Sequence, residues 1–235
     1  MATKLNPLLC ELHAHTTWSD GALSVRELVD LHGHAGFDVL AVTDHTAHAG
    51  NVDETDFPDY LNELELEAAR AQSLYGMLVI PGLELTHEED DPSRSGHVVA
   101  VGLHAFVGVA AGLEAALRKA RAHGAALIAA HPYLPGEAAT STRRTAAFAA
   151  DPEHWAPLVD RFELFNRDTL FPWVAEAGLP VVANGDFHIP EHLSTWKTML
   201  PCAKDERAVV EYLRSPRPAY LVNLGAPAEE LRQAA

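Results

Sequence analysis

The feature that most constrains the fold of this chain is a regular alternation between short apolar segments and helical patterns. Helical periodicity is clear over residues 59–75, where Leu64 and Ala71 lie on one apolar stripe. Repeated strand-then-helix units predict a mostly parallel sheet. About seven such units favour a TIM-like barrel over a doubly wound sheet, although periodicity by itself leaves both open. We expect strands over residues 8–12, 38–42, 77–80, 98–103, 125–130, 161–165, 181–184 and 219–222.

Local signals mark several helix boundaries. Ser24 and Glu27 have the spacing of a capping box, which predicts the start of a helix that stops at Gly36. Gly76 is expected to end the helix over residues 59–75. We expect further helices over residues 113–123, 171–177 and 205–213, and a loop that leads into a short helix within residues 135–150.

Composition and charge exclude several classes of protein. Of the 235 residues, 48% are hydrophobic, which is enough for a substantial core. The formal net charge of −16 argues against non-specific nucleic-acid binding, which needs clustered Lys and Arg. A small anionic substrate stays open, because bound divalent metals would reverse the local charge. The chain shows no run of about 18 apolar residues and no signal peptide, and it has only two cysteines, so we expect a cytoplasmic protein that spans no membrane.

Side chains that can bind metals gather at the ends of the predicted strands. The chain has 14 histidines, and histidine is the commonest metal ligand. Because the carboxyl ends of parallel strands meet at one face of a barrel, we expect these side chains to converge. His97 is the exception, since it stands at the start of its apolar run. The others are His13, His15, Asp20, Asp44, His45, Glu84, His131, Asp186 and His188.

The spacing within these motifs has a geometric meaning. Residues i and i+2 of an extended segment point to the same side, so His13 and His15 can face one metal. The same holds for Asp186 and His188. The two carboxylate oxygens of Glu84 can bridge two ions. Imidazole and carboxylate ligands together suit zinc, manganese or iron.

Each motif also has an ordinary structural explanation. A single His-x-His occurs on surfaces and in cores, Asp20-Gly21 is typical of a turn, and His131-Pro132 can simply end a strand. What favours a metal site is the coincidence of these motifs at successive strand ends.

Six motifs occur in order along about residues 8–195. They are HAHTTWSDG (13–21), AVTDH (41–45), PGLE (81–84), GHVVAVGL (96–103), AHP (130–132) and GDFH (185–188). This set resembles the successive motifs of the PHP (polymerase and histidinol phosphatase) family. The resemblance implies a distorted TIM-like (β/α)7 barrel, a single domain over residues 1–235 and phosphoesterase activity. Family members include histidinol phosphatases, nucleotide phosphatases and domains of bacterial DNA polymerases.

The resemblance also implies nine ligands for two to three divalent metal ions. Glu84 would bridge the first and second ions. The three groups are His13, His15, Glu84 and Asp186 for the first ion, Glu84, His97 and His131 for the second, and Asp20, His45 and His188 for the third.

The mechanistic hypothesis is attack on phosphorus by a metal-activated hydroxide. Glu84 and Asp186 are then the central catalytic carboxylates, since both belong to the first group of ligands. His48 and His192 follow ligand motifs closely, and either could protonate the leaving group. His32 and His34 lie within the first helix and are expected on the surface.

Arginine suits bidentate binding of phosphate. Arg143 and Arg144 follow the His131 motif in a loop that could overhang the site. Arg94, Arg167 and Lys197 are weaker candidates. We expect the partner to be a small phosphorylated substrate resembling a nucleotide, a sugar phosphate or histidinol phosphate, and the choice between monoester and diester stays open.

Two other classes of function remain open. A metal-dependent amidohydrolase would also place His-x-His at the end of the first barrel strand, often with a metal-bridging lysine. A non-catalytic metal-binding or sensor protein is the second alternative, although structural zinc sites are usually Cys-rich and Cys10 and Cys202 lie outside every motif. None of the lysines ends a predicted core strand; they are Lys4, Lys119, Lys197 and Lys204.

Overall fold

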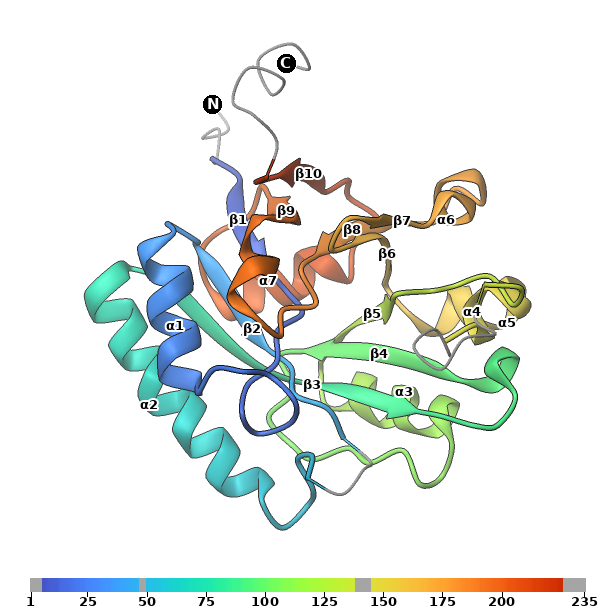
Figure 1. Ribbon diagram of the computed structural model, residues 1–235, viewed down its shortest axis with the longest axis horizontal. Coiled ribbons are helices and arrows are strands. Elements are labelled where there is room, and N and C mark those ends of the chain that lie inside the picture. Colours follow the sequence, from blue (N-terminus) through green and yellow to red (C-terminus); the bar gives the residue numbers. More distant parts are fainter. Residues whose placement is uncertain (1–5, 47–49, 138–144, 226–235) are drawn as a thin grey trace.

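The structure, a computed structural model, describes residues 6–46, 50–137 and 145–225. Within these ranges one curled sheet has the strand order β10-β9-β1-β2-β3-β4-β5-β6-β7, and β8 pairs with β6 (Figure 1). The strands are β1 (Leu8–Glu11), β2 (Val39–Val42), β3 (Leu78–His87), β4 (Gly96–Val101), β5 (Ala126–Ala130), β6 (Arg161–Asn166), β7 (Thr169–Leu170), β8 (Val181–Asn184), β9 (Trp196–Leu200) and β10 (Tyr220–Asn223). The sequence predicted all of them except β7 and β9, and it ended β3 too early.

The expected parallel pairing holds in two blocks of the sheet. β1, β2 and β3 run parallel to one another in one block, and β5, β6 and β8 do so in the other. Between the blocks β4 is antiparallel to both β3 and β5. The eight residues between β3 and β4 form a hairpin connection, so β4 starts at the edge where its neighbours end. His97 is therefore opposite Thr86 on β3 and Ala130 on β5.

The sheet closes on itself at the carboxyl ends of β1 and β8. His15 N donates to Phe187 O at 2.8 Å, and Phe187 N donates to His13 O at 3.0 Å. Between β8 and β9 the Thr198 hydroxyl bridges the backbone, accepting from Ala183 N and donating to Ala183 O. The curled sheet is thus a distorted barrel, as the sequence predicted, and its closure brings residues 13–15 against residues 185–188.

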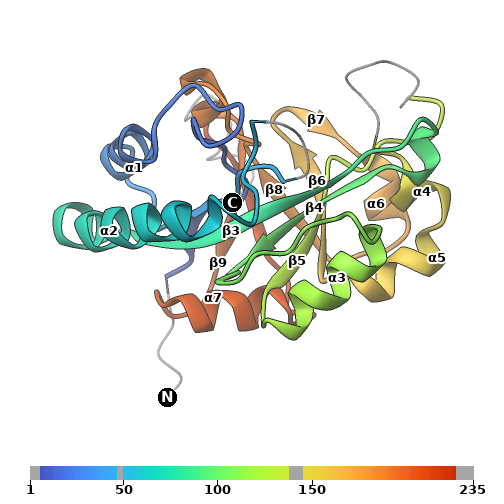
Figure 2. The same ribbon diagram turned by 90° about the horizontal axis from the view of Figure 1, so that it is seen from below.

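Helices other than α7 cover the outside of this sheet. α1 and α2 lie side by side along one flank, and α4 and α5 lie on the opposite side (Figures 1 and 2). The helices are α1 (Val25–His34), α2 (Phe57–Tyr75), α3 (Leu113–Ala122), α4 (Ala147–Ala150), α5 (Pro152–Trp155), α6 (Pro172–Glu176) and α7 (Glu206–Leu213), with 3-10 turns η1 (Pro92–Arg94), η2 (Ala156–Leu158) and η3 (Pro190–Ser194). In the described ranges no helix is both long and apolar enough to cross a membrane.

The predicted helix signals are present. The Ser24 side chain accepts from Glu27 N, and the Glu27 carboxylate accepts from Ser24 N, which is the predicted capping box of α1. Gly76 ends α2 with a φ of 63°, a conformation that glycine adopts without a steric penalty.

Strand residues alternate between two apolar clusters. On β2, Val39 and Ala41 belong to the cluster that contains Leu213 of α7, whereas Leu40 and Val42 belong to the cluster on the side of the other helices. The period of two is that of a pleated strand. α7 therefore lies over the amino-terminal end of the barrel interior, and the carboxyl end is left to the polar residues.

Candidate metal centre

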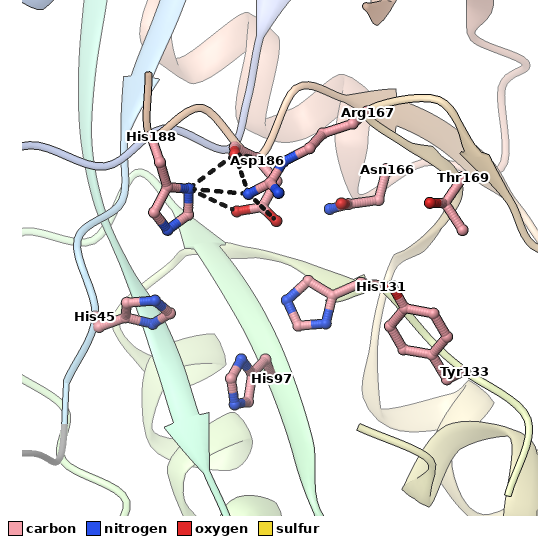
Figure 3. Close-up of a pocket in the computed structure, with 9 residues that line it drawn as sticks. All are labelled: His45, His97, His131, Tyr133, Asn166, Arg167, Thr169, Asp186 and His188. Carbon is pink, nitrogen blue, oxygen red and sulfur yellow. Dashed lines mark hydrogen bonds and ion pairs between the residues drawn. The ribbon is translucent and has the colours of Figure 1, made fainter. Parts of the chain in front are cut away.

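All nine predicted ligands lie together at the carboxyl edge of the sheet. They come from the segments after β1, β2, β5 and β8, from β3, and from the start of β4. Figure 3 shows five of them, His45, His97, His131, Asp186 and His188, turned toward a common space. The antiparallel direction of β4 is what brings His97 to this edge.

Glu84 stands at the centre of the cluster and is fully buried. Its Oε1 is 3.1 Å from His97 Nδ1 and 3.2 Å from His131 Nε2. Its Oε2 faces a different set of rings, at 3.4 Å from His13 Nε2, 3.5 Å from His15 Nε2 and 2.7 Å from His45 Nδ1. Because its two oxygens face different histidines, Glu84 has the arrangement of a bridging ligand.

Two aspartates complete the cluster. Asp186 Oδ1 is 3.6 Å from His13 Nε2, 3.5 Å from His15 Nε2 and 3.3 Å from His188 Nδ1. Asp20 is more exposed, and its Oδ1 lies 3.2 Å from His188 Nε2 and 3.6 Å from His45 Nε2. Among the described residues, potential ligand atoms within 4.8 Å of one another form three overlapping groups, His13–His15–Glu84, His45–Glu84–His97 and His15–Asp20–His45–His188.

Unpaired buried atoms show that the cluster fits divalent metals. The Nε2 atoms of His13 and His15 are buried without a hydrogen-bond partner, and both face Glu84 Oε2, which makes no aligned hydrogen bond itself. Buried polar atoms are normally paired, so several unpaired atoms that converge need another partner. Ligand atoms about 2.0–2.2 Å from a tetrahedral ion lie about 3.3–3.6 Å apart, which is how far each of these nitrogens lies from Glu84 Oε2. The set of imidazole nitrogens and carboxylate oxygens is suited to such an ion.

Residues 11–150 match the family model of the PHP domain. The chain belongs to the PHP family. This confirms the family that the motifs resembled.

Individual relatives are more distant. A stretch of 45 residues is 40% identical to the DNA polymerase/3'-5' exonuclease PolX of Bacillus subtilis, and it makes up 19% of this chain and 8% of that polymerase. A two-domain protein of Bacteroides vulgatus containing a predicted PHP-like metal-dependent phosphoesterase superposes with a TM-score of 0.70 at 19% identity, over 94% of this chain and 66% of that chain. An amidohydrolase from Chromobacterium violaceum, solved with bound sulfate and no metal, superposes with a TM-score of 0.55 at 16% identity, over 94% of this chain and 99% of that chain. At these identities the two structures support only the fold of this PHP-family chain and say nothing of its activity.

The charges in the PHP site oppose the effect of burial on its carboxylates. Burial by itself raises the pKa of Glu84, but His45, His13 and His97 outweigh it and hold that pKa well below the usual value. The pKa of Asp186 is likewise lowered, since His13 and its neighbours outweigh burial. Both carboxylates therefore stay ionised over the physiological range.

Neighbouring charges and burial also give the histidines different pKa values. Burial lowers the pKa of His97, but Glu84 and Glu88 outweigh it and raise that pKa to about 9. For His15, burial and the nearby His45 together lower the pKa to about 3. Metal ligands must be deprotonated, so an ion that binds at His97 displaces a proton.

A buried glutamate that the sequence reading missed holds several ligands in place. Glu163 on β6 accepts from His13 Nδ1 at 2.9 Å and from His131 N at 2.8 Å. Its carboxylate also accepts from the side-chain amides of Asn166 and Asn184. Such a partner fixes the orientation and tautomer of a ligating imidazole. The signal for it was the one acidic residue within the predicted strand over residues 161–165.

Asp44, which follows β2, supports the loop after β1 in a comparable way. Its carboxylate accepts from Thr16 N at 2.7 Å, from Thr16 Oγ1 at 2.8 Å and from Ser19 Oγ at 2.6 Å. These contacts occupy Asp44 and fix the segment that carries Asp20.

Backbone strain is concentrated at the site. Among the described residues, three non-glycine residues have a positive φ: His131 at 30°, Arg167 at 52° and Asp186 at 42°. All three line one pocket. Sparsely populated conformations persist only where tertiary contacts impose them, and they cluster at functional sites.

The cluster opens into a pocket of about 250 Å³. Its lining residues, drawn in Figure 3, are His45, His97, His131, Tyr133, Asn166, Arg167, Thr169, Asp186 and His188. Arg167 is the cation among them, and its guanidinium donates to Asp186 Oδ2 at 3.1 Å and to Asp186 O at 3.0 Å. Of the weaker arginine and lysine candidates, the structure brings this one to the site.

The remaining predictions have mixed outcomes. Arg94 pairs with Glu89 away from the pocket. His32 is fully buried, with Nδ1 donating to Leu28 O and its ring packed against Phe187, so the surface prediction was wrong for it and right for the exposed His34. The helical position of His32 faces inward because α1 covers the barrel at the GDFH segment.

The proposed proton donors and phosphate-binding arginines lie partly outside the described residues. His48, Arg143 and Arg144 fall outside those ranges. His192 lies next to the ligands, and its Nδ1 accepts from His188 N at 3.1 Å. Burial, followed by the charge of Arg167, lowers the pKa of His192 to about 4.

Proposed function

We propose that this PHP-family protein is a metal-dependent phosphoesterase that hydrolyses a small phosphoester resembling a nucleotide, a sugar phosphate or histidinol phosphate. One observation carries the proposal: a buried cluster of ligand atoms without hydrogen-bond partners opens into a small pocket that also holds an arginine. Divalent cations would bind the unpaired ligand atoms, and an anion bound to these cations would face the arginine.

We assign the nine ligands to two or three ions of zinc, manganese or iron, in the groups that the family resemblance implies. The two oxygens of Glu84 support a bridge between the first and second ions. The contacts of Asp20 Oδ1 with His45 and His188 support the third group. Bound ions would supply Lewis acidity toward phosphate oxygens and lower the pKa of water.

The residues of the chain itself would bind and orient the substrate. Arg167 lines the pocket and holds Asp186, so its guanidinium can meet a phosphate oxygen beside that ligand. Arg143 and Arg144 remain proposed contacts to the same anion. Tyr133 and Thr169 also line the pocket and would contact the leaving group.

The proton donor to the leaving group is a proposal between His48 and His192. A general acid must carry a proton at the working pH. With a pKa of about 4, the His192 ring is neutral at pH 7, which favours His48.

Lys197 weakens the amidohydrolase alternative. This lysine is fully buried, and its Nζ contacts Glu11, His192 O and Thr195 Oγ1. None of these is one of the nine ligands, so Lys197 is not placed to bridge metals.

We further propose that one PHP-type domain spans residues 1–235, with its metal-binding core at about residues 8–195, and that the protein acts in the cytoplasm. The ligands extend from His13 to His188, which supports the core. Cys10 and Cys202 are buried free thiols, as is usual in a reducing compartment.

The test combines metal analysis with a screen of phosphate release. Metal-free protein is reconstituted with manganese, zinc or iron, and bound metal is counted by elemental analysis. Release is then followed from nucleotides, sugar phosphates, histidinol phosphate and a chromogenic phosphodiester. We expect two to three ions per chain and release that depends on them. Bound metal without phosphate release from any ester would contradict the phosphoesterase and favour the amidohydrolase or the metal-sensor function.

An arginine pair tests the pocket. Arg167→Ala should raise KM for the best ester by about 10-fold or more, because a charge-assisted contact to phosphate is lost. Arg94→Ala is the matched control, since Arg94 pairs with Glu89 outside the pocket, and its KM should stay at the wild-type value. Equal KM values in the two variants would remove Arg167 from the substrate site.

A further inference from the structure

A buried ion pair lies directly against the segment that carries two proposed ligands. Lys197 on β9 and Glu11 at the end of β1 are both fully buried, and Lys197 Nζ is 3.0 Å from Glu11 Oε2. Neither residue lines the pocket. Burying two charges is unfavourable unless further hydrogen bonds satisfy them, so the remaining contacts of the pair indicate its role.

Glu11 holds the beginning of the GDFH segment. Its Oε1 accepts from Gly185 N at 2.9 Å and from His13 N at 3.3 Å. The backbone of Gly185 packs so closely that a Cβ atom there would overlap both Glu11 Oε2 and Lys197 Nζ. Glu11 therefore joins the backbones of the two segments that carry His13 and Asp186.

Lys197 holds the end of the same segment through His192. Its Nζ donates to His192 O at 2.9 Å and to Thr195 Oγ1 at 2.8 Å. The ring of His192 in turn accepts from His188 N at 3.1 Å. The amides of Gly185 and His188 are thus both fixed by groups that the ion pair connects.

The segment between these two amides requires such support. Asp186 has a φ of 42°, a left-handed conformation that a non-glycine residue adopts only when its surroundings impose it. The next residue, Phe187, is buried against His32. Without the contacts at both ends, only the backbone bonds of Phe187 and the guanidinium of Arg167 would hold Asp186 in this conformation, so we expect its carboxylate to be less firmly placed.

We propose that Glu11 and Lys197 are positioning residues whose ion pair fixes Gly185–His188 and thereby sets the metal affinity of Asp186 and His188. The proposal rests on the metal site proposed above. It gives Lys197 a role that involves no contact with substrate or metal, and it gives His192 a structural role whichever group donates the proton.

The test uses two variants of the pair and one matched control in the full chain. Lys197→Met removes one charge, and Glu11→Gln combined with Lys197→Met removes both, which avoids an uncompensated buried carboxylate. The control is Arg161→Met. Arg161 is also a buried cation bonded to backbone carbonyls, but those belong to Tyr212, Leu213 and the residues that follow, away from the ligands.

Two readouts are compared. The first is zinc or manganese affinity, measured by competition with a chelator on folded protein. We expect both pair variants to bind about 10–100-fold more weakly, as when an orienting partner of a ligand is lost. The second is amide hydrogen exchange of the metal-free protein, where Gly185 and His188 should exchange faster in the pair variants and at the wild-type rate in Arg161→Met.

The outcomes separate this proposal from the proposed function. A folded double variant with wild-type metal affinity and wild-type exchange at both amides would overturn the positioning role. The same loss of affinity in Arg161→Met would also overturn it, because the effect would then be general destabilisation. If wild-type protein bound no metal, the proposed function would fail, while exchange at Gly185 and His188 would still decide whether the pair fixes the segment.

Discussion

Arg161 and Glu84 are both fully buried charged residues of one sheet, but their surroundings are opposite. Arg161 stands at the start of β6 and donates to the carbonyls of Leu213, Tyr212, Ser215 and Arg217. Glu84, at the carboxyl edge, faces His13 Nε2 and His15 Nε2, which are left without hydrogen-bond partners.

The difference shows how a buried charge that stabilises the fold can be distinguished from one that binds a ligand. Around Arg161 the donors meet carbonyl oxygens of the chain at the end of α7, so nothing further is needed there. Around Glu84 the unpaired nitrogens of His13 and His15 face a carboxylate oxygen, and a divalent cation satisfies nitrogens and a carboxylate together. Substitutions at the two places should therefore affect different properties.

Glu84→Gln should produce the largest effect. Loss of the charge that faces five histidines should remove bound metal and lower phosphate release by about 10³-fold, comparable with the loss of a central transition-state contact. Elemental analysis and initial rates on the same sample measure both. Full metal content with full activity would remove Glu84 from the bridging role and would end the contrast with Arg161.

Arg161→Met should show the reverse pattern. Several buried carbonyls lose their donor, so we expect the free energy of unfolding to fall by about 2–4 kcal/mol. Metal content per folded chain should be unchanged. Denaturant unfolding of the metal-free protein, beside metal analysis, provides the measurement. A variant as stable as wild type would mean that water replaces the guanidinium.

Glu163→Gln should lie between these two extremes, because Glu163 is fully bonded like Arg161 but bonded to the site. A glutamine side chain has one acceptor oxygen in place of two, so the His13 ring or the His131 backbone loses its acceptor. We expect metal affinity about 10–100-fold weaker, with kcat recovered at saturating metal. Glu67→Gln is the matched control, because Glu67 is a buried glutamate of α2 that pairs with Arg26 of α1 and Arg70 of α2. Equal affinities in the two variants would make Glu163 a structural residue only.

The pH dependence of stability should show the smallest effect, at His32. Burial lowers the pKa of this ring to about 4 from its usual 6.5, so the unfolded chain takes up the proton first. His32 therefore contributes stability that is present above pH 6.5 and is lost as the pH falls from 6.5 toward 4. Between pH 6.5 and 5 this amounts to about 1–2 kcal/mol.

Comparison with a variant isolates that contribution from the other histidines. The free energy of unfolding of metal-free wild type and of His32→Gln is measured at both pH values, and the difference between the proteins should narrow by about 1–2 kcal/mol toward pH 5. Parallel curves would show that His32 does not titrate across this window, and its burial beneath Phe187 would then have no effect on acid stability.

Much of the site could be read from local sequence. His-x-His at residues 13–15 and Asp-x-His at residues 186–188 needed only the period of an extended chain, and both pairs indeed lie on one side. The capping box of α1 and the glycine stop of α2 likewise depend on neighbouring residues alone. The PHP resemblance added His97, which strand-end reasoning had left aside.

Other features escaped because their cause is not local. The antiparallel direction of β4 depends on which strands it pairs with. β9 contains Lys197, a residue type that is usually exposed, and its burial depends on the ion pair with Glu11 of β1. Arg167 was one of several unexceptional arginines, and its left-handed φ of 52° is imposed by the fold.

By itself, then, the sequence determined the types of residue that can bind metal and their placement beside strand ends, since residue chemistry and the two-residue period of a strand are properties of a few consecutive positions. Only the tertiary structure decided that Glu11 meets Lys197, that Glu163 meets His13, and that both carboxylates are buried. The physical reason is that the pairing of buried charges depends on the closure of the barrel, which brings together segments from opposite ends of the chain.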